Sequence, residues 1–217
     1  MSDTKVDYKK LYSDLYYPQK SPSIIQIPRM NFVMVDGAGV PGSESEEYQK
    51  AMQLLYSISF TIKMSKMTGD QPKGYFDYVV PPLEGLYSCG KEPFDFAKSE
   101  QWTWTSMIRQ PEFVTKDVYD WAITKAVAKA EDKGKDIDYS KARYSVYEEG
   151  PCVQMMHIGP YSNEQITIDE IFMFIEENGL KVDYGPERKH HEIYLSDPRK
   201  SKPENLKTVI RYPVKRG

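Results

Sequence analysis

The sequence predicts an α+β fold in which two pseudo-symmetric β-α-β-β modules form one antiparallel sheet, with helices on one face and a groove on the other. Short apolar runs of strand character alternate with segments of helical periodicity. The order strand, glycine turn, capped helix and two strands occurs twice, and the turns at Gly37 and Gly159 occupy corresponding places. One such module cannot cover both faces of its own small sheet, so we expect the two to share a groove.

A polar arm, residues 1–22, precedes one domain, residues 23–217, whose modules span about 23–135 and 136–217. The arm carries acidic residues and has no apolar core, so we do not expect it to be a secretory signal. No stretch approaches the roughly 18 apolar residues that a membrane-spanning helix needs. We therefore expect a cytoplasmic location.

The first module is predicted to begin with an apolar strand at 31–35 that runs into a glycine-rich turn. Ser43 and Glu46 have the spacing of a capping box, which predicts a helix to about Lys66. Two prolines at 81–82 separate the next two expected strands. The remaining elements are strands at 75–80, 83–89 and 102–109 and a helix at 115–133.

The second module repeats this order. Ser162 and Gln165 form a second possible capping box, and Gly179 stops the helix that follows at Asn178. The repeat also aligns residues 84–88 with 192–196. The strands expected in this module are 144–148, 152–158, 190–196 and 206–214.

The net charge, the cysteine pattern and the absence of known motifs argue against several classes of function. The net charge is −3 and the lysines and arginines are scattered, so direct binding of nucleic acid is not expected. Cys89 and Cys152 lack the spacing of a metal site and are expected to be small core residues in a reducing compartment. No metal motif, dinucleotide fingerprint or nucleophile elbow is present, so no cofactor is expected. The content of 17 Tyr, 3 Trp and 10 Met suits a protein that binds aromatic molecules.

The strand at 190–196 places an acidic residue in the proposed groove. Alternation puts Ile193 and Leu195 on the core face. Glu192 then points to the opposite face, together with His190 and Tyr194. A solvated strand glutamate is the other interpretation of the same pattern.

Three further residues have two interpretations each. Trp102 and Trp104 share one strand face and form either part of the core or a wall for a ligand. Glu164 lies in the first turn of its helix, where a negative charge complements the helix dipole. Alternatively, Glu164 projects over the groove and faces Glu192, and two such carboxylates drive their pKa values apart.

These residues resemble the GyrI-like small-molecule-binding proteins, and among them the stand-alone, duplicated-module branch. The resemblance covers nearly the whole chain from about Tyr8. Its more specific parts are the Trp-x-Trp strand and the run KHHEIYLSD, whereas HIGPY is less specific. The landmarks are 30–37 (MNFVMVDG), 102–104 (WTW), 110–114 (QPEFV), 157–161 (HIGPY), 189–197 (KHHEIYLSD) and 207–211 (KTVIR).

The resemblance implies a groove lined by aromatic side chains with Glu192 at its centre. Relatives of this branch look like hydrolases that open the cyclopropane ring of DNA-alkylating natural products of the yatakemycin and duocarmycin type. This implies detoxification and drug resistance by a cofactor-independent hydrolase. Glu192 or Glu164 would activate water. The proton donor would be a tyrosine hydroxyl, Tyr161 or Tyr87, or the second, protonated glutamate. The residues expected to hold the planar aromatic ligand are Trp102, Trp104, Tyr87, Met156, His157 and Tyr194.

Two other functions stay open at this point. One is a non-catalytic, multidrug-binding protein that sequesters its ligands, and the other is a module that binds a protein such as gyrase. Other members of the superfamily are sensing domains of transcription regulators, but no helix-turn-helix segment is recognisable before residue 30, which disfavours a regulator. We expect a monomer or a weak dimer.

Overall fold

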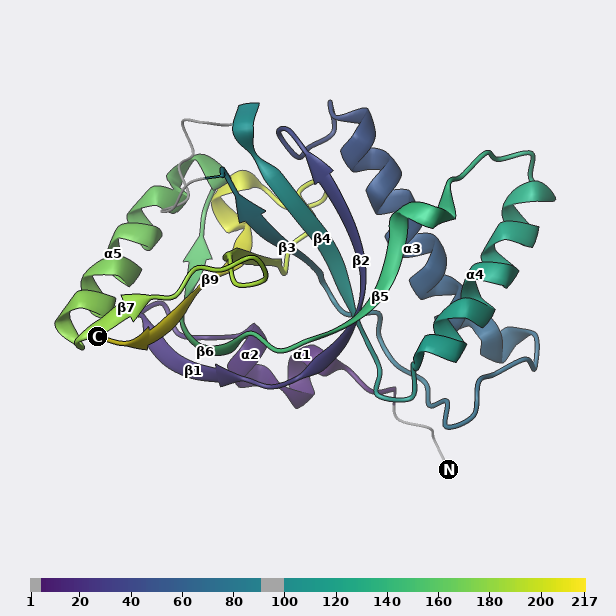
Figure 1. The fold of residues 1–217 in the computed structure, drawn as a ribbon, viewed down its shortest axis with the longest axis horizontal. Helices are drawn as coiled ribbons and strands as arrows, with labels where there is room; N and C mark the ends of the chain where they lie inside the picture. Colours follow the sequence, from purple (N-terminus) through teal and green to yellow (C-terminus); the bar gives the residue numbers. More distant parts are fainter. Residues whose placement is uncertain (1–4, 91–99) are drawn as a thin grey trace.

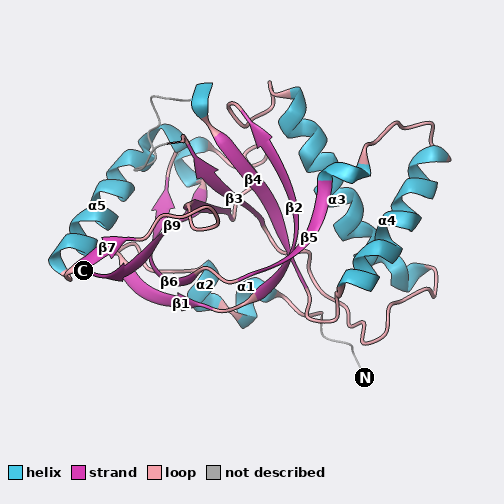
Figure 2. Cartoon of the chain, in the orientation of Figure 1, coloured by secondary structure: helices cyan, strands magenta, loops and turns pink. Residues whose placement is uncertain are grey.

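The computed structural model describes residues 5–90 and 100–217, so the first four residues of the predicted arm lie outside it. One antiparallel sheet runs through the molecule, with helices along it (Figures 1 and 2). The helices are α1 (Tyr8–Leu11), α2 (Ser13–Tyr16), α3 (Glu46–Met64), α4 (Lys116–Glu131) and α5 (Glu164–Glu177). The strands are β1 (Ser23–Ile27), β2 (Met30–Ala38), β3 (Leu83–Ser88), β4 (Thr103–Gln110), β5 (Ala142–Tyr147), β6 (Gly150–Ile158), β7 (Leu180–Val182), β8 (His190–Tyr194) and β9 (Lys207–Arg216).

The strands lie in the order β1-β6-β9-β8-β3-β4-β2-β5, and β7 pairs with β9 outside this series. The first strand set (β2, β4 and β3) comes from the first half of the chain. The second strand set (β6, β9 and β8) comes from the second half. The two sets meet where β3 pairs with β8. This arrangement confirms the predicted α+β class. Because β1 pairs with β6 and β5 with β2, each set is completed by a strand from the other half. The module boundary near residue 135 stays a prediction.

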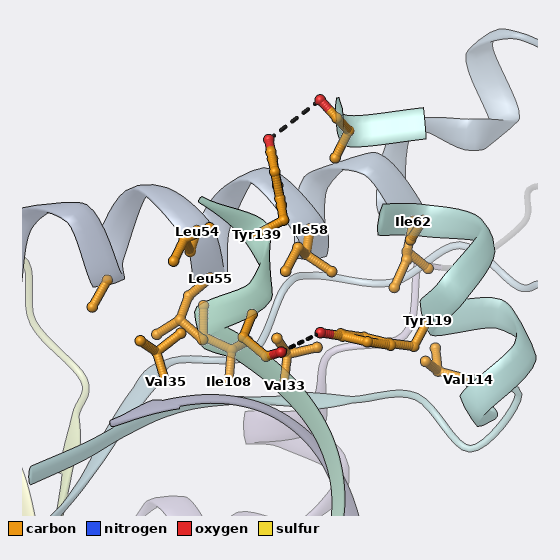
Figure 3. Packing of buried hydrophobic residues seen from close by; sticks show 14 of the residues in the cluster. Val33, Val35, Leu54, Leu55, Ile58, Ile62, Ile108, Val114, Tyr119 and Tyr139 are labelled. Atoms are coloured by element: carbon orange, nitrogen blue, oxygen red, sulfur yellow. Dashed lines mark hydrogen bonds between the residues drawn. The ribbon is translucent and has the colours of Figure 1, made fainter. Parts of the chain in front are cut away.

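Helix α3 packs on the first strand set and shares a core with α4. Figure 3 shows Leu54, Leu55 and Ile58 of α3 beside Val33 and Val35 of β2. Burying each such side chain stabilises the fold by about 1.5–3 kcal/mol. The helix begins two residues later than the predicted capping box, because the hydroxyl of Ser45 accepts a hydrogen bond from the backbone N–H of Tyr48 at 3.2 Å.

Helix α4 begins where the sequence predicts, since the hydroxyl of Thr115 accepts a hydrogen bond from the backbone N–H of Val118. Two tyrosines tie this helix region to its surroundings. The hydroxyl of Tyr119 donates to the carbonyl of Ala142 at 2.7 Å, and the hydroxyls of Tyr139 and Ser57 lie 2.7 Å apart (Figure 3).

Helix α5 packs on the second strand set, against β6, β7 and β9. A 3₁₀ turn, η4 (Tyr161–Asn163), precedes it, and Asn163 is its N-cap without a side-chain hydrogen bond. The predicted capping box of Ser162 and Gln165 is therefore wrong. The amide of Gln165 donates instead to Asp169, one turn further along. Gly179 ends the helix as predicted, with a φ of 64° that other residues rarely adopt.

The N-terminal arm is folded, whereas the sequence predicts a polar arm without elements. It forms α1 and α2, and it buries Tyr8, Leu15 and Tyr16 against the sheet. The predicted strand at 75–80 is also wrong, because this segment makes only an isolated parallel bridge between Tyr78 and Val6 of the arm. It runs along the arm rather than joining the sheet.

A buried polar network lies under the arm. The guanidinium of Arg211 donates to Glu149 Oε2 at 3.1 Å and to the carbonyl of Leu15 in α2 at 3.0 Å. Glu149 Oε2 also lies 2.9 Å from His191 Nδ1, and His191 Nε2 lies 3.1 Å from Glu84 Oε2. All four charged side chains are buried, so each depends on the others for compensation. The network joins the arm to β3, β8 and β9.

The two faces of the sheet carry different groups. We call the face covered by α3 and α5 the helix side, and the face covered by α1 and α2 the arm side. Ile193 packs on the arm side, and Glu192 faces the helix side. Glu192 therefore does not lie on the face opposite the helices, where the sequence predicts the groove, because α1 and α2 cover that face. Glu192 pairs with Gly85 across the strands and Ile193 with Glu84, so Glu84 points to the arm side and is not the counterpart of Glu192.

Both cysteines are buried, which confirms their predicted place in the core. Among the described residues, no helix has the length and apolar character that a bilayer crossing requires.

Candidate active site

Glu192 lies in the middle of β8 with its carboxylate buried on the helix side; only 6% of the residue is exposed. Both oxygens have partners from the same strand. The hydroxyl of Tyr194 donates to Oε2 at 2.7 Å, and His190 Nε2 lies 2.7 Å from Oε1. A carboxylate only accepts, so Nε2 of His190 carries a hydrogen. The alternation of the strand places all three side chains together, as the sequence predicts for their shared face.

Tyr87 extends this chain of hydrogen bonds from the neighbouring strand β3. Its hydroxyl lies 2.5 Å from the hydroxyl of Tyr194. Because Tyr194 gives its hydrogen to Glu192, Tyr87 is the donor to Tyr194. Burial and the charge of Glu192 raise the pKa of Tyr87 and of Tyr194 well above the ordinary value, so both stay neutral. Tyr87 is already committed as a donor, which disfavours its predicted role as the acid.

A glycine makes room for Tyr87. A Cβ at Gly85, directly across from Glu192, would lie 2.6 Å from the Tyr87 hydroxyl oxygen and 2.7 Å from a ring carbon. Only a residue without a side chain lets this ring lie back along the strand. The same relation holds between Gly37 of β2 and Trp104 of β4, where a Cβ would meet the indole at 2.2 Å.

Glu164 brings a second carboxyl group to the site from the first turn of α5. The residue is 2% exposed, and its Oε1 is buried without a hydrogen-bond partner among the described residues. Burial, followed by the charge of Glu192, raises the pKa of Glu164 to about 10. Glu164 is therefore protonated at neutral pH, and it lies close enough to Glu192 to feel its charge.

Two tyrosines flank the carboxyl pair from the starts of α3 and α5. Tyr161, just before α5, is 39% exposed, and its ring lies 6.0 Å from that of Tyr194 in an edge-on arrangement. Burial and the charges of Glu164 and Glu192 raise the pKa of Tyr161 to about 12. Tyr48, in the first turn of α3, is half-buried, and burial and the charge of Glu192 raise its pKa too.

The two tryptophans differ in their surroundings. Trp104 is 1% exposed and packs in the α3 core, 5.3 Å from the ring of Tyr48. Trp102 is half-buried at the edge of that core, 6.4 Å from the ring of Tyr87. Trp104 is therefore a core residue that supports the site. Trp102 has the partial exposure that a ligand wall needs.

His157 stabilises the junction of β6 and α5 through two hydrogen bonds. Its Nδ1 lies 2.8 Å from the hydroxyl of Thr167 and its Nε2 lies 3.2 Å from the carbonyl of Pro160. The carbonyl only accepts, so Nε2 donates to it and Nδ1 accepts from Thr167. With both nitrogens engaged, His157 fixes the start of α5, and thereby Glu164, rather than offering a contact to a ligand.

Met156 lies away from Glu192. It is buried on the arm side with Ile193 and Val209. Its neighbours His157 and Met155 point to the other face, because side chains alternate along β6. The predicted contact of Met156 with a ligand is therefore corrected: this side chain belongs to the core under the arm.

Three residues of this site were not among the expected catalytic or ligand-binding residues: Tyr48, Gly85 and His190, although the sequence does place His190 beside Glu192. A glycine inside a predicted strand, two residues before a tyrosine, signals a close approach by another group. His190 shares a strand face with Glu192 at a spacing of two, which is the distance at which neighbours on one face meet. Nothing in the helical pattern distinguishes Tyr48 from the core residues of α3.

The comparison with known families gives a match over most of the chain. The model of the GyrI-like small molecule binding domain matches residues 20–215. The chain belongs to the GyrI-like family.

Solved structures agree with this GyrI-like assignment. The chain is similar to an uncharacterized conserved protein from Listeria innocua, with 50% identity and a TM-score of 0.90 over 97% of this chain and all of the other. It is similar to a protein called a hydrolase from Listeria innocua, with 48% identity and a TM-score of 0.85 over the same shares. The EcmrR C-terminal domain, at 13% identity and a TM-score of 0.54 over 91% of this chain and 98% of that one, shares the fold alone. None of the curated proteins compared with the chain matches it.

Proposed function

We propose that this GyrI-like protein binds a flat, mostly apolar small molecule beside Glu192 and hydrolyses it with a water molecule that Glu192 activates. The observation that carries the proposal is a buried carboxylate whose two oxygens are held at 2.7 Å by Tyr194 and His190. An oriented base of this kind contributes about 10²–10⁴-fold to a proton-transfer step. Similarity at 48% identity to a protein called a hydrolase supports a hydrolytic reaction.

The substrate class we propose is the DNA-alkylating natural products of the yatakemycin and duocarmycin type. Such a compound carries a strained cyclopropane conjugated to a carbonyl on a planar aromatic body. The oxygen of water bonds to the ring CH₂ as the ring C–C bond breaks, and the electron pair moves through the conjugated system to the carbonyl oxygen. Glu192 takes one proton from the water. A proton donor of the site converts the new oxyanion to a phenol, and ring strain supplies driving force.

Aromatic rings around Glu192 supply the binding surface for the planar body. Trp102, Tyr48 and Tyr194 are half-buried and Tyr161 is exposed, so these rings mark the side from which a ligand reaches the carboxylate. An offset or edge-on aromatic contact contributes about 0.5–1.5 kcal/mol beyond its buried area. Two or three such contacts hold a polycyclic compound without a charged partner.

Incubation of the purified protein with a cyclopropane-bearing alkylator tests the proposal. Mass spectrometry should show the compound gaining the mass of one water. Glu192→Gln keeps the shape of the side chain but loses the base, and it should lower turnover by about 10²–10⁴-fold while binding persists. Glu170→Gln, at an exposed glutamate of α5, is the matched control and should behave as the unmodified protein.

An unchanged compound that nevertheless binds tightly would contradict hydrolysis and would assign the alternative, a non-catalytic protein that sequesters its ligands. In that case Glu192→Gln changes affinity for cationic dyes and no product forms with any variant. Absence of binding as well would refute the ligand class.

A further inference from the structure

The two carboxyl groups of the site differ in how many hydrogen-bond donors they receive. Glu192 receives one donor on each oxygen, from Tyr194 and from His190. Glu164 has a buried Oε1 with no partner among the described residues. An ionised carboxylate is stabilised by donors, whereas a buried carboxyl group that lacks them favours its neutral form.

The two carboxyl groups cannot both be charged in the same apolar environment. Their mutual repulsion and the cost of desolvation favour a single negative charge for the pair. The single negative charge is more stable on Glu192, the carboxyl group that receives the two hydrogen-bond donors. The high pKa of Glu164, which burial and the charge of Glu192 cause, agrees with this division. The other titratable groups around the pair are His190, whose Nε2–H donates to Glu192, and four tyrosines that stay neutral. These are Tyr194 of β8, Tyr87 of β3, Tyr48 of α3 and Tyr161 from the turn before α5.

His190 is placed to hold the charge on Glu192 without touching a ligand. It is fully buried, with its ring 4.9 Å from that of Tyr212 and 6.1 Å from that of Tyr87. Its Nε2–H reaches Glu192 Oε1 from the protein interior. Tyr194 contributes the second donor and is itself fixed by Tyr87.

We propose that His190 is the positioning residue that fixes Glu192 as the ionised base, and that Glu164 is the proton donor of the same reaction. The assignment rests on the proposed function and divides its two proton transfers between two carboxyl groups. As the water oxygen bonds to carbon, Glu192 gains a proton. As the ring bond breaks, Glu164 gives its proton to the carbonyl oxygen. One proton then returns from Glu192 to Glu164, so the site regains its starting state and only water and substrate are consumed.

Infrared spectroscopy tests where the proton lies without any turnover. At neutral pH the protein should show the C=O stretching band of a buried carboxylic acid. Glu164→Gln should remove this band, whereas Glu192→Gln and the exposed control Glu170→Gln should keep it. Loss of the band in Glu192→Gln but not in Glu164→Gln, or its absence from the unmodified protein, would overturn the assignment.

Kinetics with the cyclopropane probe test His190. His190→Leu removes a hydrogen bond to a charged group, which should lower kcat by about 10- to 100-fold and leave KM nearly unchanged. His190→Gln places an amide N–H near the position of Nε2 and should recover most of this loss. A merely structural role would instead lower the free energy of unfolding and shift kcat and KM together. Equal losses in the two variants would refute the positioning role.

The proposed function and the proton assignment can each be refuted without the other. If no probe is hydrolysed but the infrared band belongs to Glu164, the proposed function fails and the proton assignment stands. The ¹⁵N spectrum of His190 then tests its part, since its Nε2 resonance should shift in Glu192→Gln. An unshifted resonance would show that His190 does not hold Glu192.

Discussion

Raising the pH should destabilise this protein through one buried histidine, His191. It lies between Glu149, 2.9 Å from Nδ1, and Glu84, 3.1 Å from Nε2, and only 1% of it is exposed. Burial by itself lowers its pKa, but the charge of Glu149 and the hydrogen bonds to both glutamates outweigh this and raise the pKa to about 9. His191 is therefore a buried imidazolium at neutral pH.

The size of the effect on the free energy of unfolding follows from the change in the pKa of His191. Raising the pKa from 6.5 to about 9 corresponds to about 3 kcal/mol, at roughly 1.4 kcal/mol per pH unit. Because the pKa is higher in the folded than in the unfolded chain, this contribution is complete below pH 6.5 and is lost as the pH rises to about 9. Glu149, whose pKa the same contacts lower to about 2, gives the opposite limb, lost as the pH falls below 4.5.

Urea unfolding at several pH values between about 6 and 9 measures the effect as the free energy of unfolding. The unmodified protein should lose up to about 3 kcal/mol across this window. His191→Gln should be less stable at low pH and nearly flat across the window. It retains His157 and His190, so comparison of the two proteins isolates His191. A flat profile for the unmodified protein, or the same slope in the variant, would refute the reasoning.

Two further changes test the site. Gly85→Ala places a methyl group where the Tyr87 hydroxyl lies, so it should break the hydrogen bond of Tyr87 to Tyr194 and lower kcat by about tenfold, the effect of one hydrogen bond; unchanged kinetics would contradict the packing. Trp102→Ala removes a half-buried ring and should weaken binding of a planar ligand by about tenfold in fluorescence titration, with kcat little changed. A loss confined to kcat would instead place Trp102 outside the binding surface.

Helices were predictable because their signals are local. Periodic apolar positions and N-cap residues lie within one segment, so α3, α4 and α5 were found with ends wrong by a few residues. Thr115 was the correct cap, and the caps at Ser45 and Asn163 differ from the predicted ones by one or two positions. Neighbouring polar residues compete for such a position, and the helix geometry selects one of them.

The arm shows the limit of local patterns. Helices of four residues have no periodicity to detect, and α1 and α2 are held by contacts with distant parts of the chain. Arg109 of β4 stacks on the rings of Tyr8 and Tyr12, at 4.5 and 4.3 Å, and Arg211 binds the carbonyl of Leu15. Each partner is separated by about a hundred residues or more, so the sequence order gives no sign of the contact.

By itself, the sequence determined which side chains of β8 share a face. Alternation in a strand fixes this without any knowledge of the partners, and Glu192 lies with His190 and Tyr194 as a result. Only the tertiary structure decided which face the arm covers, that Glu84 lies opposite Ile193, and that Glu164 lies close enough to Glu192 to feel its charge. Those facts depend on strand register and on packing between distant segments, and a shift of one residue in register reverses every face.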